Sequence, residues 1–136
     1  MGQQQLLLII LGVIIVGIAV AVGITMFQDN AVSANRDAVT NDLVQLAAKA
    51  QQYYRKPTSL GGGGNSFITL TAAAGMDLLV STAFSNNDNG TYTIPANASA
   101  TTVIFQGVGK TDIGGGSFPT YTCTVTAAGY VIAKTN

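Results

Sequence analysis

Histidine and glutamate are absent from this sequence, and Cys123 is its only cysteine. One cysteine excludes a disulfide within the chain. The absence of histidine excludes, within one chain, the usual zinc sites of cysteine and histidine, histidine general bases and Ser-His-Asp triads. An oxygen-rich loop at 86–89 holds one carboxylate but lacks the glutamate that an EF-hand requires. We therefore expect no enzymatic activity, no cofactor and no metal site.

Charge is also scarce. Charged residues make up 9% of the chain, against roughly 25% in ordinary soluble domains. Six basic residues balance six acidic ones, all of them aspartate. The chain therefore lacks the basic stripe that nucleic-acid binding requires and the polybasic patch that binds anionic lipid. We expect no nucleic-acid partner; a charge-poor surface instead suits a subunit that is largely covered by copies of itself.

The N-terminal segment is the most informative part of the chain. Residues 1–28 contain no charged side chain, and residues 6–27 are almost purely hydrocarbon. Roughly 20 apolar residues are enough to cross a bilayer as a helix. A cleaved signal peptide fits poorly, because a cationic start is missing and the apolar core exceeds about 15 residues. Two interpretations remain: a single-pass anchor for an exported domain, or a helix that first lies in the membrane and later packs in the core of a polymer.

Residues 28–56 are predicted to continue the same helix as an amphipathic segment. Apolar residues recur on one stripe at about 100° per residue, and polar residues occupy the other faces. No proline occurs before Pro57, which ends the helix because the residue before a proline is pushed out of helical geometry. We expect one continuous helix of about 50 residues, roughly 75–80 Å long. The stripe comprises Val32, Val39, Leu43, Leu46, Ala47, Ala50, Tyr53 and Tyr54.

Arg36 lies near the edge of this apolar stripe, and Asp29 lies on the same side two turns earlier. One interpretation is a long side chain at the border of the stripe that keeps its charge in water. The alternative is an ion pair between subunits that sets their register.

Residues 57–136 are expected to form an antiparallel β domain of about four or five strands, one face of which covers the second half of the helix. The glycine-rich stretch 59–66 is interpreted as a flexible loop. Residues 74–84 fit either a short helix or an irregular crossover, and Ala128-Gly129 is expected to form a hairpin turn. Alternating patterns predict strands at 67–71, 91–94, 102–106, 120–126 and 130–133.

Cys123 shares a strand face with Tyr121 and Val125, and we interpret it as a small core residue. An intermolecular disulfide is the alternative. Taken together, the patterns predict an α+β fold with three parts: a hydrophobic helix over 1–27, its amphipathic continuation over 28–56, and the β domain over 57–136.

The order of a long helix, hydrophobic then amphipathic, a glycine-rich loop and a small antiparallel sheet resembles type IV pilins. In sequence the resemblance lies in residues 6–27 and in the run from Ala50 to Tyr54. Type IV pilins carry a glutamate at the fifth residue of the mature chain, after cleavage by a prepilin peptidase. That position is Gln5 if Met1 begins the mature chain, or Leu7 if cleavage follows Gly2. Archaeal pilins, archaellins and some divergent bacterial pilins resemble this chain in lacking that glutamate.

The resemblance implies a major structural subunit of an extracellular, pilus-like filament at the cell surface. It implies a precursor inserted in the inner membrane, a pilus assembly machinery as partner, and further copies of the chain as the main contact. Two alternatives remain: a pseudopilin of a secretion system, and an extracellular binding domain held by a single-pass anchor.

Several residues are candidates for assembly. Gly12, Gly17 and Gly23 each cost about 1 kcal/mol of helix propensity relative to alanine, so we expect the helix to lengthen or unwind between them in a fibre. The alternative is that these glycines only allow helices to approach closely. Val16 lies in the middle of the segment, where a charge is expected to abolish fibres.

Two segments match the pattern for N-linked glycosylation. Asn89 is followed by Gly90-Thr91, and Asn97 by Ala98-Ser99. Both lie in predicted turns, and both are candidate modification sites.

Overall fold

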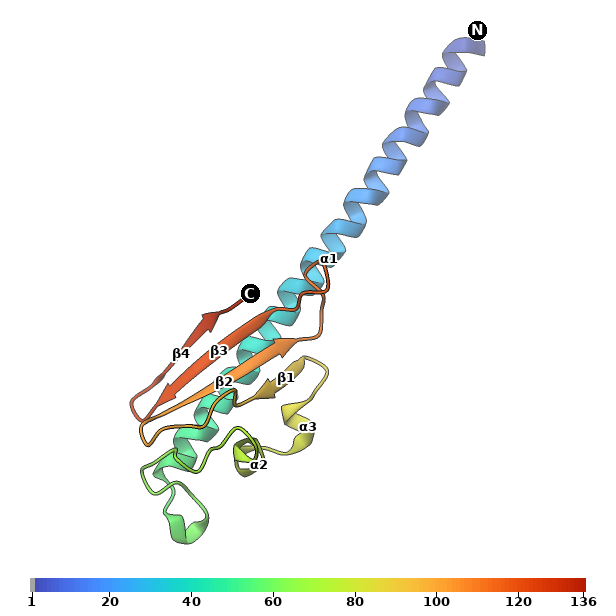
Figure 1. The fold of residues 1–136 in the computed structure, drawn as a ribbon. Helices are drawn as coiled ribbons and strands as arrows, with labels where there is room; N and C mark the ends of the chain where they lie inside the picture. The colour runs from blue at the N-terminus through green and yellow to red at the C-terminus, as the bar shows by residue number, and fades with distance from the viewer. Residues whose placement is uncertain (1) are drawn as a thin grey trace.

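The computed structural model describes residues 2–136 and has an α+β architecture, in which one long helix packs on a four-stranded antiparallel sheet. The C-terminal half of the helix lies against the sheet, and the N-terminal half projects away from it (Figure 1). The elements are α1 (Gly2–Arg55), the 3-10 turn η1 (Thr58–Leu60), α2 (Gly75–Leu79), α3 (Thr82–Ser85), β1 (Gly90–Thr93), β2 (Thr102–Gly109), β3 (Thr120–Thr126) and β4 (Tyr130–Lys134).

Helix α1 is continuous over 54 residues. At 1.5 Å per residue it is about 80 Å long, as the uninterrupted pattern before Pro57 predicts. The expected division of its faces is also confirmed. The stripe residues from Val39 to Tyr53 are buried, and Val32 and Tyr54 are half-buried. The polar residues predicted for the other faces, such as Gln45 and Lys49, are exposed.

The sheet follows the order β1-β2-β3-β4, with every neighbouring pair antiparallel. Strands β3 and β4 form the predicted hairpin, in which the Thr126 amide donates to the Gly129 carbonyl at 2.8 Å. Strand β2 extends to Gly109, three residues beyond the predicted end. Glycine hides the alternation there, because Gly107 has no side chain to show which face it belongs to. A Cβ atom at Gly107 would lie 3.0 Å from both Val39 and Tyr92, so glycine lets the strand approach the helix.

The predicted strand at 67–71 is wrong. Phe67 and Leu70 are both fully buried, but they lie three residues apart in a turn, in which the Leu70 amide donates to the Phe67 carbonyl at 2.8 Å. A buried pair at this spacing belongs to a turn and not to an alternating strand. The segment at 74–84, for which the sequence allowed either a short helix or an irregular crossover, contains α2 and most of α3.

The glycine-rich stretch after α1 is a packed cap and not the flexible loop expected from composition. The amide of Gly63 donates to the Tyr53 carbonyl at 2.8 Å, Gly64 to Lys56 at 2.9 Å and Asn65 to Tyr54 at 2.7 Å. These bonds satisfy carbonyl groups that the end of a helix leaves without partners. Glycine is required because a Cβ at Gly62 would lie 2.3 Å from the Lys56 carbonyl oxygen.

The core lies between the buried stripe of α1 and one face of the sheet. Cys123 is fully buried within it, which confirms its interpretation as a core residue, and burial raises the pKa of its thiol to about 11. The fully buried side chains from the sheet are Tyr92, Val103, Phe105, Cys123 and Val125.

Candidate functional site

The projecting half of α1 is the main candidate for a functional surface. Its large apolar side chains from Leu6 to Phe27 are between 50% and 82% exposed. Covering on the order of 1,000 Å² of such surface is worth about 25 kcal/mol at ~25 cal/mol per Å². A surface of this size and uniformity requires an apolar environment, because exposure of apolar side chains to water is unfavourable.

The same helix is long and apolar enough to cross a membrane, and its most apolar window is not buried by any other part of the described chain. The first buried residue of α1 is Val39, so about 37 residues, or roughly 55 Å of helix, precede the packed core. The hydrocarbon core of a bilayer is about 30 Å thick. The projection therefore consists of an apolar part that can lie in a membrane and a more polar part between it and the sheet domain.

Gly12, Gly17 and Gly23 lie within regular helix and face open space, since a Cβ atom at any of them would meet nothing within 4 Å. Gly12 and Gly23 are about three turns apart and so lie on the same side of the helix. Because neither glycine has a side chain, they leave two small gaps between side chains on one face of the projection. Lengthening between Gly12 and Gly23 concerns the assembled state and stays a prediction.

Gln5 and Val16 are both exposed on this projection. Asp29 is exposed as well, and it precedes Arg36 by seven residues, or about 10 Å along the axis. Arg36 is half-buried, and its Nε is a buried nitrogen for which residues 2–136 provide no hydrogen-bond partner. The structure does not bring Arg36 and Asp29 together within one chain, so an ion pair between subunits stays a prediction.

Asp42 is a buried polar residue that sequence reasoning missed. It is 7% exposed on the sheet-facing side of α1. Its Oδ2 accepts hydrogen bonds from the Tyr92 hydroxyl at 2.7 Å, from Asn87 Nδ2 at 2.9 Å and from Asn89 Nδ2 at 3.1 Å. Burial, followed by the hydrogen bond and the negative charge of Asp42, raises the pKa of Tyr92 far above its usual value. The position of Asp42 three residues after Val39 and four before Leu46 is the signal that reveals it, because a residue at that spacing faces the core.

This network bears on the two glycosylation candidates. The side-chain nitrogen of Asn89, which a glycan would occupy, donates to buried Asp42, and this geometry argues against Asn89. Asn97 is exposed and uses its Oδ1 to accept from the Ala72 amide at 3.0 Å. Asn97 therefore stays the candidate for modification.

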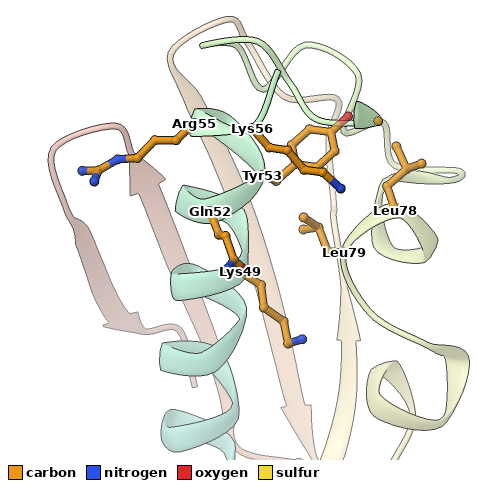
Figure 2. A pocket seen from close by; sticks show the side chains of 8 residues that line it. Lys49, Gln52, Tyr53, Arg55, Lys56, Leu78 and Leu79 are labelled. Carbon is orange, nitrogen blue, oxygen red and sulfur yellow. The ribbon is translucent and has the colours of Figure 1, made fainter. Parts of the chain in front are cut away.

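A shallow hollow lies where α1 ends, between α1 and α2. Figure 2 shows Lys49, Tyr53 and Lys56 on the helix side and Leu78 and Leu79 on the other, with Arg55 directed to the far side of α1. The hollow is lined by no carboxylate and no cysteine. Among residues 2–136, no three histidine, cysteine or acidic side chains gather as metal ligands would. The arrangement offers cationic and apolar contacts but no pair of groups suited to acid–base or nucleophilic chemistry.

Comparison with models of protein families, with curated proteins and with solved structures found no match for this chain. The features of the chain that bear on its function are therefore the projecting apolar helix and the sheet domain that it carries.

Proposed function

We propose that this chain is the structural subunit of an extracellular filament of the type IV pilus kind, assembled by packing of its N-terminal helices. The observation that carries this proposal is a single helix whose first half is exposed and apolar on all sides, while its second half is one-sided and covered by a sheet.

A membrane satisfies the apolar half before assembly, because every backbone hydrogen bond of a helix is internal. Extracted into water, the same half exposes its side chains at a cost of about 25 kcal/mol or more. Packing against the same segment of other copies removes this cost. A contact that joins one surface of a subunit to a different surface of the next does not close on itself, so it produces a helical fibre.

The continuity of α1 supports this proposal over a simple anchor. No break separates the apolar part from the part packed on the sheet, so the sheet domain is held at a set distance and rotation from the apolar segment. An anchor for a binding domain has no need of such a rigid link. A pseudopilin of a secretion system shares the same layout and differs in abundance and in fibre length.

Electron microscopy of material sheared from cells that produce the chain tests the proposal. We expect long fibres that bind antibodies raised against residues 57–136, and mass spectrometry of the purified fibres should identify this chain as their main component. Cells that carry the chain in their membranes but shed no labelled fibres would contradict a major filament subunit. Short labelled fibres only in the presence of a secretion system would favour the pseudopilin.

A further inference from the structure

The charges of this neutral chain are divided between the two ends of the sheet domain. We call the end from which α1 projects the proximal end, and the end where α1 stops the distal end (Figure 1). The proximal end is located by Asn35, whose side chain donates to the Asn89 carbonyl and accepts from the Thr111 amide. The loop before β1 contains Asp88, and the loop after β2 contains Asp112. Both loops therefore lie at the level of Asn35.

The proximal end has an excess of negative charge. Five aspartates lie there against three cations, which leaves two negative charges. All of these aspartates except Asp42 are exposed. The aspartates are Asp29, Asp37, Asp42, Asp88 and Asp112, and the cations are Arg36, Lys110 and Lys134.

The distal end has the opposite excess. Lys49, Arg55 and Lys56 are all exposed, and Asp77 on α2 is their only acidic neighbour at this end of the described chain. Two positive charges remain. Exposed apolar side chains accompany them: Leu60 is 66%, Ile68 62% and Leu78 53% exposed.

The junction between the apolar projection and the proximal end has matching features. Met26 and Phe27 are 63% and 82% exposed, and Asp29 and Asp37 follow them on the same helix. An apolar surface beside negative charges therefore lies at one end of the domain, and an apolar surface beside positive charges lies at the other.

We propose that the distal end of one copy docks on the helix–sheet junction of another copy, by pairing its cations with the junction aspartates and its exposed leucine and isoleucine side chains with Met26 and Phe27. This inference rests on the proposed function, because only a polymer places successive copies end to end. The two surfaces differ, so the contact is head-to-tail and open. Complementary charges of this kind mainly set register and exclude wrong pairings.

Zero-length carbodiimide cross-linking of sheared fibres, followed by mass spectrometry, tests the pairing. This reagent joins a lysine amine directly to a carboxylate that it touches. Lys56 lies 19 residues beyond Asp37, about 28 Å along the helix axis, so a bond between Lys56 and Asp37 or Asp29 cannot form within one chain. We expect such cross-links in fibres, and we expect Lys56→Arg to remove them while keeping the charge and the fibres.

Charge reversal provides an independent test. The double variant Arg55→Asp and Lys56→Asp places like charges opposite each other, and we expect it to lower fibre yield by about tenfold or more. Adding Asp29→Lys and Asp37→Lys in the same chain is expected to restore fibres. The matched control is Lys110→Asp with Lys134→Asp, which makes the same change of charge at the proximal end and should leave yield unchanged.

The outcomes separate the two proposals. Fibres without a cross-link from Lys56 to Asp29 or Asp37, or fibres unaffected by reversal at Arg55 and Lys56, would overturn the end-to-end pairing alone. Absence of any fibre from the unaltered chain would overturn both.

Discussion

Val16 illustrates why single residues matter more in a polymer than in an anchor. It is 62% exposed in the isolated chain, so nothing within the subunit depends on its size or polarity. In a membrane it meets lipid, and in the proposed fibre it meets the same segment of other copies. Its environment therefore distinguishes the two functions.

Replacing Val16 with aspartate is predicted to leave some membrane-inserted protein but to abolish fibres. Insertion of one charge costs about 2.5–3.5 kcal/mol on translocon scales, whereas in a fibre each copy buries an unpaired charge at several kcal/mol. Membrane fractionation and electron microscopy measure the two effects, with Val16→Leu as the apolar control. Fibres of normal length from the aspartate variant would refute the helix-packed core.

Asp42 is stabilised by three neutral donors, and Tyr92 makes the shortest of these hydrogen bonds, at 2.7 Å. Tyr92→Phe leaves the ring in place but removes the donor. We expect a loss of roughly 1–3 kcal/mol, because a hydrogen bond to a charged group is lost in a buried site. Thermal unfolding of the full chain in detergent, followed by circular dichroism, measures it. Tyr130→Phe is the control, since Tyr130 is 44% exposed and its substitution should change stability little.

At the level of secondary-structure elements, the end of α1 depends on the glycine-rich cap more than on helix propensity. Gly63 and Asn65 donate to carbonyl groups in the last turn of the helix, and Gly64 donates to the carbonyl of Lys56, just beyond it. The cap also folds the chain back over Tyr53, whose hydroxyl hydrogen-bonds with Thr69 at 2.7 Å. The cap therefore links the helix to the turn that replaces the predicted strand at 67–71.

Gly63→Ala is predicted to destabilise the domain by roughly 1–3 kcal/mol. An added Cβ would lie 2.1 Å from the Ser66 carbonyl oxygen and 3.0 Å from the Tyr53 ring, so the cap must shift. Gly129→Ala is a matched control, because a Cβ there meets nothing within 4 Å. Equal unfolding temperatures of the two variants would show that the cap does not constrain the helix end.

At the scale of the whole molecule, stability is expected to fall in alkali. Burial raises the pKa of Cys123 from 9.0 to about 11, so above pH 9 the unfolded chain loses this proton while the folded chain keeps it. The unfolded state is then favoured as pH rises, and the thiol contributes a loss of about 2–3 kcal/mol as the pH passes 11. Tyr92 adds a loss above pH 10, because its pKa is also raised on folding.

Urea unfolding of the full chain in detergent at pH 7 to 11 measures this dependence. Stability is expected to be constant below about pH 9 with respect to these two groups and to decrease above it. Tyr92→Phe should show a smaller decrease above pH 10 than the unaltered chain. Stability that rises between pH 9 and 11 would contradict the assignment.

Removal of residues 1–28 is predicted to yield a soluble, monomeric sheet domain. The packed core begins at Val39, so the deletion removes exposed apolar surface and no buried contact of the described residues. Sedimentation and circular dichroism of the truncated chain check this expectation. Oligomers that persist at low concentration would show that the sheet domain associates without the helix.

The sequence by itself determined the features that follow from a local period. The long uninterrupted helix, its change from uniform to one-sided apolarity, the hairpin of β3 and β4 and the burial of Cys123 were all predicted, because side-chain spacing and turn residues act over a few positions. The exposed apolar projection was predicted for the same reason, since no other part of the chain was needed to define it.

Only the tertiary structure decided the features that join distant parts of the chain. Asp42 meets Asn87, Asn89 and Tyr92 across more than 40 residues, and no spacing rule identifies partners at that separation. The turn at 67–71 and the cap at Gly63 depend on contacts with the end of α1, which override the alternation and the composition of those segments. The division of charge between the two ends likewise arises when the fold brings the loops at Asp88 and Asp112 beside Asn35, because electrostatic fields depend on distance in space and not on distance along the chain.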